Sequence, residues 1–275
     1  MKPTPYKLKK SDIKRIVELY LEGYNSKELA KMFGVSSRTI LYHLGKAGVI
    51  RNRSEAATLR HNKNVNLTPS PELAYIIGAF LGDGHVGEVK SCERKGKVYK
   101  RWRFRLKVTS REFVESVAEA CRRIGLRPHI FKCDSPYYIT RATYQIPYEL
   151  VVYSKPLCLL LRDIKENLNL LKKYIEGFEK EFLRGLYEAE GSVNRSGEEI
   201  SYVTAFANTN KDLIQLVYEM LKHFKPYIIE YKPKNKNCKT QYYVRLNLCY
   251  GKKFLKWINP CIKTLSKICN LQVMS

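Results

Sequence analysis

The chain has 275 residues, and its 50 lysine and arginine residues outnumber 26 aspartate and glutamate residues to give a formal net charge of +24. Hydrophobic residues make up 44% of the chain, which is enough for one large core or two to three smaller ones. No run of about 18 apolar residues is present, which excludes a membrane-spanning protein. Because so large a positive excess repels itself, it predicts a polyanionic partner, most commonly nucleic acid, and an intracellular, cytoplasmic and nucleoid-associated protein.

Eight cysteines are scattered along the chain, and no two of them have the two-residue spacing that structural zinc sites prefer. We interpret them as reduced thiols in the core. The alternative is an occasional disulfide, as in intracellular proteins of hyperthermophiles.

Residues 11 to 50 are predicted to form three short helices. Ser11 and Ser26 are the expected caps of the first two, and residues 34–36 make a tight turn before a third helix over Ser37 to Lys46. This pattern resembles a DNA-binding helix-turn-helix, in which the third helix is the recognition helix. The outward residues of that helix are expected to contact phosphates or base edges: Ser37, Arg38, Thr39, Tyr42 and His43.

The alternative for this region is a solvated face on a small helical bundle. Residues 1 to 66 hold 14 lysine and arginine residues against 5 acidic ones, which favours DNA. Arg51 and Arg53 are expected to form an arm along the DNA backbone. We therefore place a helix-turn-helix domain at residues 1–53 and a linker at residues 54–70, before a new helix that Ser70 caps.

Two acid-tipped apolar stretches, residues 76–84 and 183–191, each end in a carboxylate followed by glycine. Each stretch has the length of a helix and carries small residues four apart, so that two such helices can pack backbone to backbone. Each is expected to end at a glycine in the left-handed conformation.

If the two helices pack side by side and parallel, Asp83 and Glu190 meet where two helix C-termini also direct partial negative charge. That clustering is unfavourable without a cation, and a divalent metal would resolve it. The alternative is a pair of capped helix ends whose carboxylates are satisfied by loop amides.

The same succession of elements follows each acid-tipped helix: a strand pair, a helix, a second strand pair and another helix. Residues 109–114 match residues 209–214 at an offset of 100, and residues 153–157 match residues 250–254 at an offset of 97. This pattern is typical of a duplicated unit. We predict an α+β fold with two pseudo-symmetric αββαββα repeats, at residues 71–177 and 178–275.

The strand predicted over residues 101–108 alternates, with four cations on one face and four apolar side chains on the other: Arg101, Arg103, Arg105 and Lys107 are the cations. We expect this face to bind nucleic-acid phosphates rather than to be simply solvated. The equivalent strand, residues 201–208, would present Ser201, Val203, Ala205 and Ala207, with no cation. An asymmetric target follows, whose bases are contacted in the second half either by these small or apolar side chains or by other strands, with residues such as Tyr243 and Arg245.

Over about residues 70 to 275 these features resemble the LAGLIDADG homing endonucleases, in the single-chain form with two motifs, behind a helix-turn-helix domain. The resemblance implies two antiparallel sheets that form a DNA-binding saddle. It also implies that Asp83 and Glu190, with Gly82 and Ala189 before them, bind two or three shared Mg²⁺ ions. The family has a lysine at the end of the last strand of each repeat, and Lys155 and Lys252 are the matching residues here. Such a lysine would stabilise the transition state or position water; the alternative is that it only contacts the DNA backbone.

The implied activity is a site-specific, metal-dependent endonuclease, acting as a monomer, that makes a staggered double-strand cut across the minor groove of a long asymmetric DNA site. Two alternatives stay open. One is a DNA-binding transcription regulator on the same scaffold that does not cleave. The other is an intron maturase, whose partner would be structured intron RNA.

Overall fold

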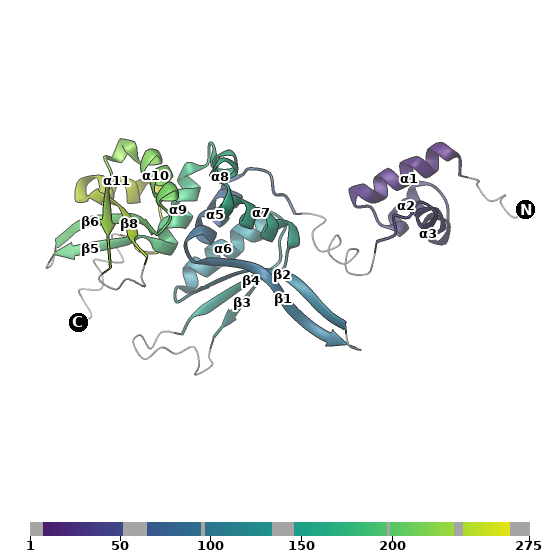
Figure 1. Ribbon diagram of the computed structural model, residues 1–275, viewed down its shortest axis with the longest axis horizontal. Coiled ribbons are helices and arrows are strands. Elements are labelled where there is room, and N and C mark those ends of the chain that lie inside the picture. Colours follow the sequence, from purple (N-terminus) through teal and green to yellow (C-terminus); the bar gives the residue numbers. More distant parts are fainter. Residues whose placement is uncertain are drawn as a thin grey trace, which may run out of the picture. The chain divides into compact units, whose positions relative to one another are not determined.

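The computed structural model describes residues 8–51, 65–94, 97–133, 146–196, 199–233 and 239–264. It divides into two compact units, Met1–Asn64 and Val65–Ser275 (Figure 1). Within the described residues, no helix combines the length and the apolar character that crossing a bilayer requires.

The first unit consists of α1 (Lys10–Glu22), α2 (Ser26–Met32) and α3 (Ser37–Lys46). The third helix has the predicted bounds. The three helices pack around a small core in which the following side chains are buried: Ile16, Leu19, Tyr20, Leu29, Ile40 and Leu44.

Both predicted caps in this unit are wrong by one or two positions. The N-cap of α1 is Lys9, whose backbone N–H donates to Asp12, and Ser11 lies inside the helix. The N-cap of α2 is Asn25, which accepts from the backbone N–H of Glu28, while Glu28 accepts from that of Asn25. Because this reciprocal pair satisfies two helix-end donors at once, it places the N-cap one residue before the predicted serine, and Ser26 becomes the first residue of the helix.

The second unit contains two repeats of one order, helix, two strands, helix, two strands, helix. The first repeat comprises α5 (Pro71–Asp83), β1 (Gly84–Arg94), β2 (Lys97–Val108), α6 (Arg111–Arg123), β3 (Pro128–Lys132), β4 (Tyr148–Val152) and α7 (Lys155–Glu166), and α8 (Leu168–Ile175) follows it. The second comprises α9 (Glu179–Glu190), β5 (Ser192–Ser196), β6 (Glu199–Asn208), α10 (Lys211–Met220), β7 (Tyr227–Tyr231), β8 (Gln241–Asn247) and α11 (Leu248–Ile258). The predicted α+β class and its two αββαββα repeats are confirmed.

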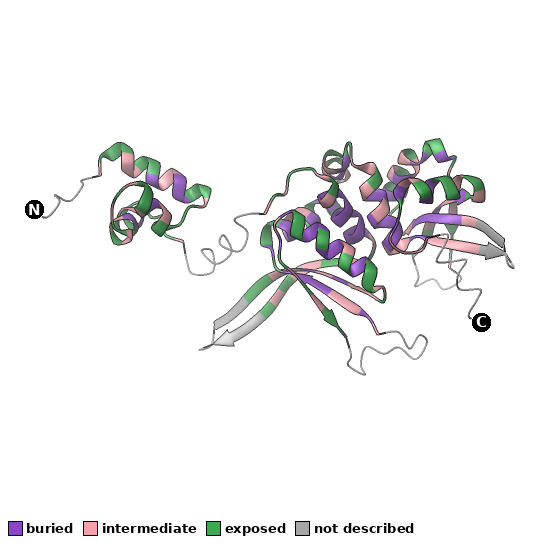
Figure 2. Cartoon of the chain, turned by 180° about the vertical axis from the view of Figure 1, so that it is seen from behind, coloured by how far each residue is buried: buried purple, intermediate pink, exposed green. Residues whose placement is uncertain are grey.

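Each repeat forms one four-stranded antiparallel sheet, with the orders β1-β2-β4-β3 and β5-β6-β8-β7. One face of each sheet packs against the helices, because alternate strand residues such as Phe104, Leu150 and Val244 are fully buried in the core. The buried residues concentrate on the central helices and on the strand faces that meet them (Figure 2). The opposite sheet faces are left open.

Helices α5 and α9 pack directly backbone to backbone, as predicted. A Cβ added at Gly78 would lie 2.2 Å from the Phe182 carbonyl oxygen, and one added at Gly185 would lie 2.3 Å from the Tyr75 carbonyl oxygen. Contacts advance in the same direction along both helices, so the pair is parallel and its two C-termini lie together. Only glycine permits so close an approach.

The predicted left-handed ends of these helices are wrong. Gly84 and Gly191 have φ values of −81° and −71° and are extended, so each helix leads directly into a strand. Both positions require glycine because a side chain there would clash with the preceding helical turn. A Cβ at Gly84 would lie 2.5 Å from the Phe80 Cα, and one at Gly191 would lie 2.1 Å from the Tyr187 ring.

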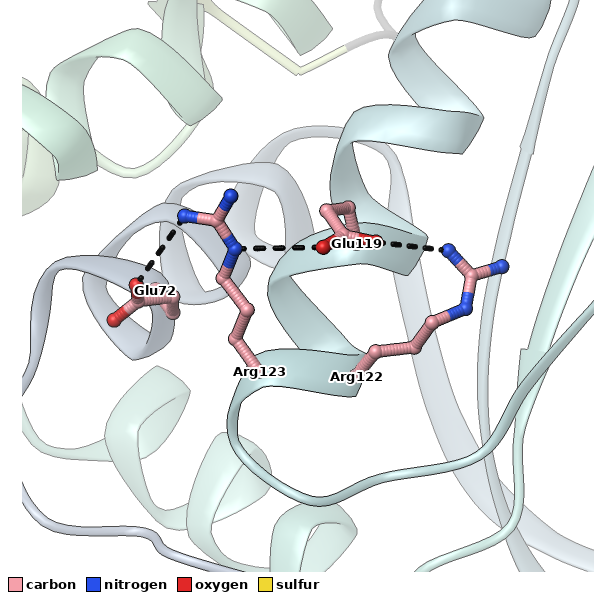
Figure 3. Close-up of polar contacts among 4 residues, drawn as sticks. All are labelled: Glu72, Glu119, Arg122 and Arg123. Atoms are coloured by element: carbon pink, nitrogen blue, oxygen red, sulfur yellow. Dashed lines mark hydrogen bonds and ion pairs between the residues drawn. The ribbon is translucent and has the colours of Figure 1, made fainter.

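Helix α6 packs against α5, and a chain of ion pairs crosses their ends (Figure 3). Arg123 lies 3.8 Å from Glu72 and 3.4 Å from Glu119, and Arg122 lies 3.2 Å from the second oxygen of Glu119. The four side chains are largely solvated, and pairs of this kind contribute at most about 1 kcal/mol each. Packing of the apolar core therefore holds α6 in place.

Candidate active site and nucleic-acid interface

Asp83 and Glu190 are the last residues of α5 and α9, and the helix packing brings them to one place. A Cβ at Gly82 would lie 2.3 Å from the Ala189 Cβ and 3.1 Å from the Glu190 Cγ. The two predicted acids therefore come from adjoining helix ends, beside the partial negative charge of both helices.

The electrostatics of the two carboxyl groups reflect this crowding. Desolvation raises the pKa of Asp83 above its usual range, and Lys263 opposes that effect. Desolvation also raises the pKa of Glu190, the charge of Asp83 raises it further, and Lys263 again opposes. Like charges therefore act on each other here, which is the arrangement that a cation stabilises.

The donor atoms suit a hard divalent ion. Two carboxylates and the backbone carbonyls of Gly82 and Ala189 could supply oxygen ligands, which Mg²⁺ prefers. Within the described residues, no group of three or more His, Cys, Asp or Glu side chains could hold a metal by itself. A metal at the acid pair would therefore need ligands from outside the chain, such as phosphate oxygens and water.

Glu188, two residues before the second acid, does not join the acid pair. Its carboxylate is buried, accepts from Arg184 Nε at 3.1 Å and from the Cys261 backbone N–H at 2.6 Å, and also accepts from the Tyr75 hydroxyl. Burial, followed by the charge of Glu188, raises the pKa of Tyr75 above its usual range. Glu188 is thus an internal anion with its own partners.

Lys263 is a site residue that the sequence analysis missed. It follows α11, and its Nζ donates to the Ala189 carbonyl oxygen at 2.8 Å. In a chain with 50 lysine and arginine residues, no local pattern marks this one. Only the return of the chain end to α9 places it beside the acids.

The two lysines predicted for catalysis have different positions. Lys155 is exposed and opens α7, three residues after β4 ends. Lys252 lies within α11, five residues beyond the end of β8, so its predicted place at a strand end is wrong. The reason is register: α7 and α11 begin at Lys155 and Leu248, 93 residues apart rather than the 97 inferred from sequence matching.

The open face of the first sheet is cationic. Phe104 and Leu106 are fully buried, which confirms the predicted alternation and leaves the four β2 cations on the other face. Arg105 pairs with Glu149 across the sheet at 3.9 Å, and the guanidinium of Arg101 lies 5.7 Å from the centre of the Tyr153 ring.

Two aromatic side chains of β3, which the sequence analysis did not single out, lie on the same open face. His129 and Phe131 are stacked with ring centres 6.4 Å apart, and Phe131 is 54% exposed. Exposed rings beside a row of cations are typical of surfaces that contact nucleic acid.

The predicted contact face of β6 is wrong at Val203 and Ala205, whereas Ala207 is partly exposed and pairs with Tyr243. Val203 and Ala205 are buried, and Val203 packs so tightly on α11 that a Cβ at Gly251 would lie 2.5 Å from its Cγ2. The pairing with β8 shifts between Thr204 and Phe206, and this bulge reverses the alternation.

The open face of the second sheet is instead built around Arg245. Its guanidinium lies 4.2 Å from the centre of the Tyr202 ring and 5.2 Å from that of Tyr243. Within the described residues, its buried Nε has no hydrogen-bond partner. Where β2 of the first sheet carries four cations, β8 of the second sheet thus carries an arginine held between two tyrosines, so these two strands differ in chemistry.

In the first unit, Arg38 and Tyr42 of α3 are exposed, and Ser37, Thr39 and His43 are partly exposed. Arg51 does not extend as an arm. Its guanidinium stacks 4.0 Å from the centre of the Tyr20 ring, and its Nη1 donates to the Tyr24 carbonyl oxygen at 3.1 Å. Arg53 lies outside the described residues.

Among the described residues, the following cysteines are thiols that form no disulfide: Cys121, Cys133, Cys158, Cys249 and Cys261. Burial raises the pKa of Cys121 and of Cys158 to about 12, which makes both thiols unreactive. Cys249 is exposed, so the prediction of a core thiol is wrong at that position.

The similarity of this chain to known proteins includes both repeats of the second unit. The LAGLIDADG-like domain family matches residues 70–165 and 177–259. The uncharacterized protein MJ0314 of Methanocaldococcus jannaschii is 30% identical over 278 residues, covering 82% of this chain and 100% of that protein. A second uncharacterized protein of that organism, MJ0398, is 33% identical over 160 residues, covering 58% of this chain and 51% of its own length.

Among solved structures, that of I-DmoI in complex with DNA and Ca has a TM-score of 0.49 at 20% identity, and the match covers 74% of this chain and 97% of that one. The two segments of the family match begin at the helices that end in Asp83 and Glu190. The chain belongs to the LAGLIDADG-like domain family and carries two of its motifs in one chain.

Proposed function

We propose that this protein is a site-specific DNA endonuclease that makes a metal-dependent, staggered double-strand cut at a long asymmetric site. The observation that carries the proposal is the acid pair, because the close approach of Gly82 to Ala189 brings together the helix ends that carry Asp83 and Glu190. Family membership supports the same conclusion.

The carboxylates of Asp83 and Glu190 would hold divalent ions, with the carbonyls of Gly82 and Ala189 as further oxygen ligands. When bound, Mg²⁺ lowers the pKa of a ligated water and offsets the charge that develops on the phosphate. The protein would fix the positions of these oxygen atoms, because the C-terminal ends of α5 and α9 are in close contact. Lys155, exposed at the start of α7, is the residue that we assign to contact with a phosphate near the cut.

The open sheet faces would bind the duplex in different ways. The four cations of β2 can each neutralise a phosphate, whereas Arg245, held between two tyrosines, can contact bases or stack on them. This difference supports an asymmetric target. The helix-turn-helix unit would add contacts through α3, chiefly from Arg38 and Tyr42.

Replacement of the acids tests the proposal. Incubation of a genomic DNA library with the protein and Mg²⁺, followed by sequencing of new ends, identifies the cut site. On that site, Asp83→Ala and Glu190→Ala should each reduce cleavage by about a hundredfold or more while DNA affinity changes only a few fold, since metal ligands act mainly in the transition state. Glu166→Ala, on an exposed carboxylate of α7, is the matched control. Cleavage by the acid variants at the wild-type rate would contradict the assignment.

A second candidate is a DNA-binding regulator that does not cleave. The bond from Lys263 to the Ala189 carbonyl favours it, because an ammonium group already stands beside the acids. The two candidates differ in a single result: a regulator enriches particular sequences from the library without producing new ends.

A further inference from the structure

The segment that follows α11, residues 259–264, is fastened to the last turn of α9; we call it the C-terminal strap. Three successive residues of α9 take part. The Tyr187 hydroxyl donates to the Lys263 carbonyl oxygen at 2.9 Å, Glu188 accepts from the Cys261 backbone N–H at 2.6 Å, and the Ala189 carbonyl accepts from Lys263 Nζ at 2.8 Å. The strap therefore ends beside Glu190, the next residue of α9.

Within the strap, Lys263 has a φ of 55°, a left-handed conformation that is unfavourable for a residue with a Cβ. Burial lowers the pKa of Lys263 below its usual value, and the charges of Asp83, Glu190 and Glu188 oppose that effect. The ammonium group that bonds to the Ala189 carbonyl is therefore also under the electrostatic influence of the acid pair. The family match ends at residue 259, so this arrangement lies beyond the matched residues.

We propose that the Lys263 ammonium group acts as the cation of the acid pair in the protein without DNA. A divalent metal binds at the acid pair only when the hydrogen bond from Lys263 to the Ala189 carbonyl oxygen breaks. This inference rests on the proposed metal-dependent function. It adds the expectation that the protein without DNA has a low affinity for divalent metal ions.

The physical argument is competition between two cations for one set of oxygens. The ammonium group uses the Ala189 carbonyl, one of the oxygens available to a metal, and its positive charge offsets the field of Asp83 and Glu190. A divalent ion that enters must break that bond and also meets a like charge. Removal of the ammonium group should therefore leave a more strongly negative site with a free carbonyl.

Titration of the DNA-free protein with Mn²⁺, followed by electron paramagnetic resonance of the free ion, tests this. Lys263→Met retains the aliphatic stem and should bind Mn²⁺ roughly fivefold more tightly or better, because a repulsive charge within a few ångströms is lost. Lys263→Arg keeps a cation and should bind weakly, as the wild type does. Lys256→Met, on an exposed residue of α11, controls for total charge and should leave the affinity unchanged.

A second measurement uses the wild-type protein. Saturating Mn²⁺ should speed hydrogen exchange at the Cys261 amide, which the strap protects through Glu188. If Lys263→Met does not fold, Tyr187→Phe loosens the strap while it keeps the ammonium group, and it should also tighten Mn²⁺ binding. Equal affinity in the folded strap variants and unchanged exchange would overturn the inference.

The acid variants separate this inference from the proposed function. If Glu190→Gln abolishes Mn²⁺ binding while Lys263→Met binds as the wild type does, Lys263 does not compete and the metal-dependent endonuclease stands. If Glu190→Gln does not change Mn²⁺ binding, whether it is introduced into the wild type or into Lys263→Met, both proposals fail.

Discussion

At the scale of single residues, three neighbouring carboxylates have two different roles. Asp83 and Glu190 lie at adjoining helix ends, where burial raises the pKa of both carboxyl groups and the charge of Asp83 raises that of Glu190 further. Glu188 is buried with one arginine, one hydroxyl and one backbone amide as partners. A buried charge of this kind depends on each partner, because water cannot replace a partner that is lost.

Arg184→Met should therefore destabilise the protein by about 3 kcal/mol, since it leaves Glu188 buried without its cation. Urea unfolding followed by circular dichroism measures the change. Arg162→Met removes an exposed pair with Asp163 at 3.4 Å and should cost no more than about 0.5 kcal/mol. Similar losses in the two variants would show that Glu188 does not require Arg184.

At the scale of elements, the active site depends on how closely two helices approach. Gly185 meets the Tyr75 carbonyl and Gly78 meets the Phe182 carbonyl, so the backbones of α5 and α9 touch through the middle of the domain. The separation of the acids is set by this contact and not by flexible side chains. A small increase in helix separation should therefore affect both stability and catalysis.

Gly185→Ala tests this dependence. The added methyl group would lie 2.3 Å from a backbone oxygen, so the helices must move apart, at a cost of about 2–3 kcal/mol or more. Cleavage should fall more than DNA affinity does. Gly87→Ala in β1, where the nearest atom is a side-chain nitrogen at 3.4 Å, is the control and should change neither quantity much. Thermal unfolding and single-turnover cleavage provide the two measurements.

At the scale of the whole molecule, the chain combines two compact units with separate cores. The acids, the strap and both sheets lie in the second unit, whereas α3 belongs to the first. Under the proposed function, chemistry and part of the recognition would therefore be carried by different units, since contacts to phosphates and bases add affinity but no reacting group.

A fragment of residues 65–275 should accordingly fold, cleave and recognise its site less selectively than the full chain. Its affinity should depend less steeply on salt, because each phosphate contact that is lost lowers the slope of log K against log salt by about 0.9. Fluorescence anisotropy over a salt series, together with sequencing of the ends produced, checks both points. Loss of all turnover in a folded fragment would count against this division of roles.

Much of the fold and half of the site could be predicted from local sequence. Period two in β2, the apolar helices that end in Asp83 and Glu190, and the repeated order of elements are properties of neighbouring residues, and each one is confirmed. Errors arose where the spacing of residues changes within an element or between the repeats. The bulge in β6 changes the alternation so that Val203 lies in the core, and a difference of four residues between the repeats places Lys252 inside the last helix rather than at a strand end.

The sequence by itself determined the α+β repeats, the close helix pair and its acids, because hydrophobic period and small-residue spacing depend only on the local chain. Tertiary structure decided which charges meet those acids. Cys261 and Lys263 contact α9 from 73 and 74 residues further along the chain, and a charge acts through space rather than along the sequence. The cation beside the acid pair, Lys263, is therefore visible only once the segment after α11 has folded back onto α9.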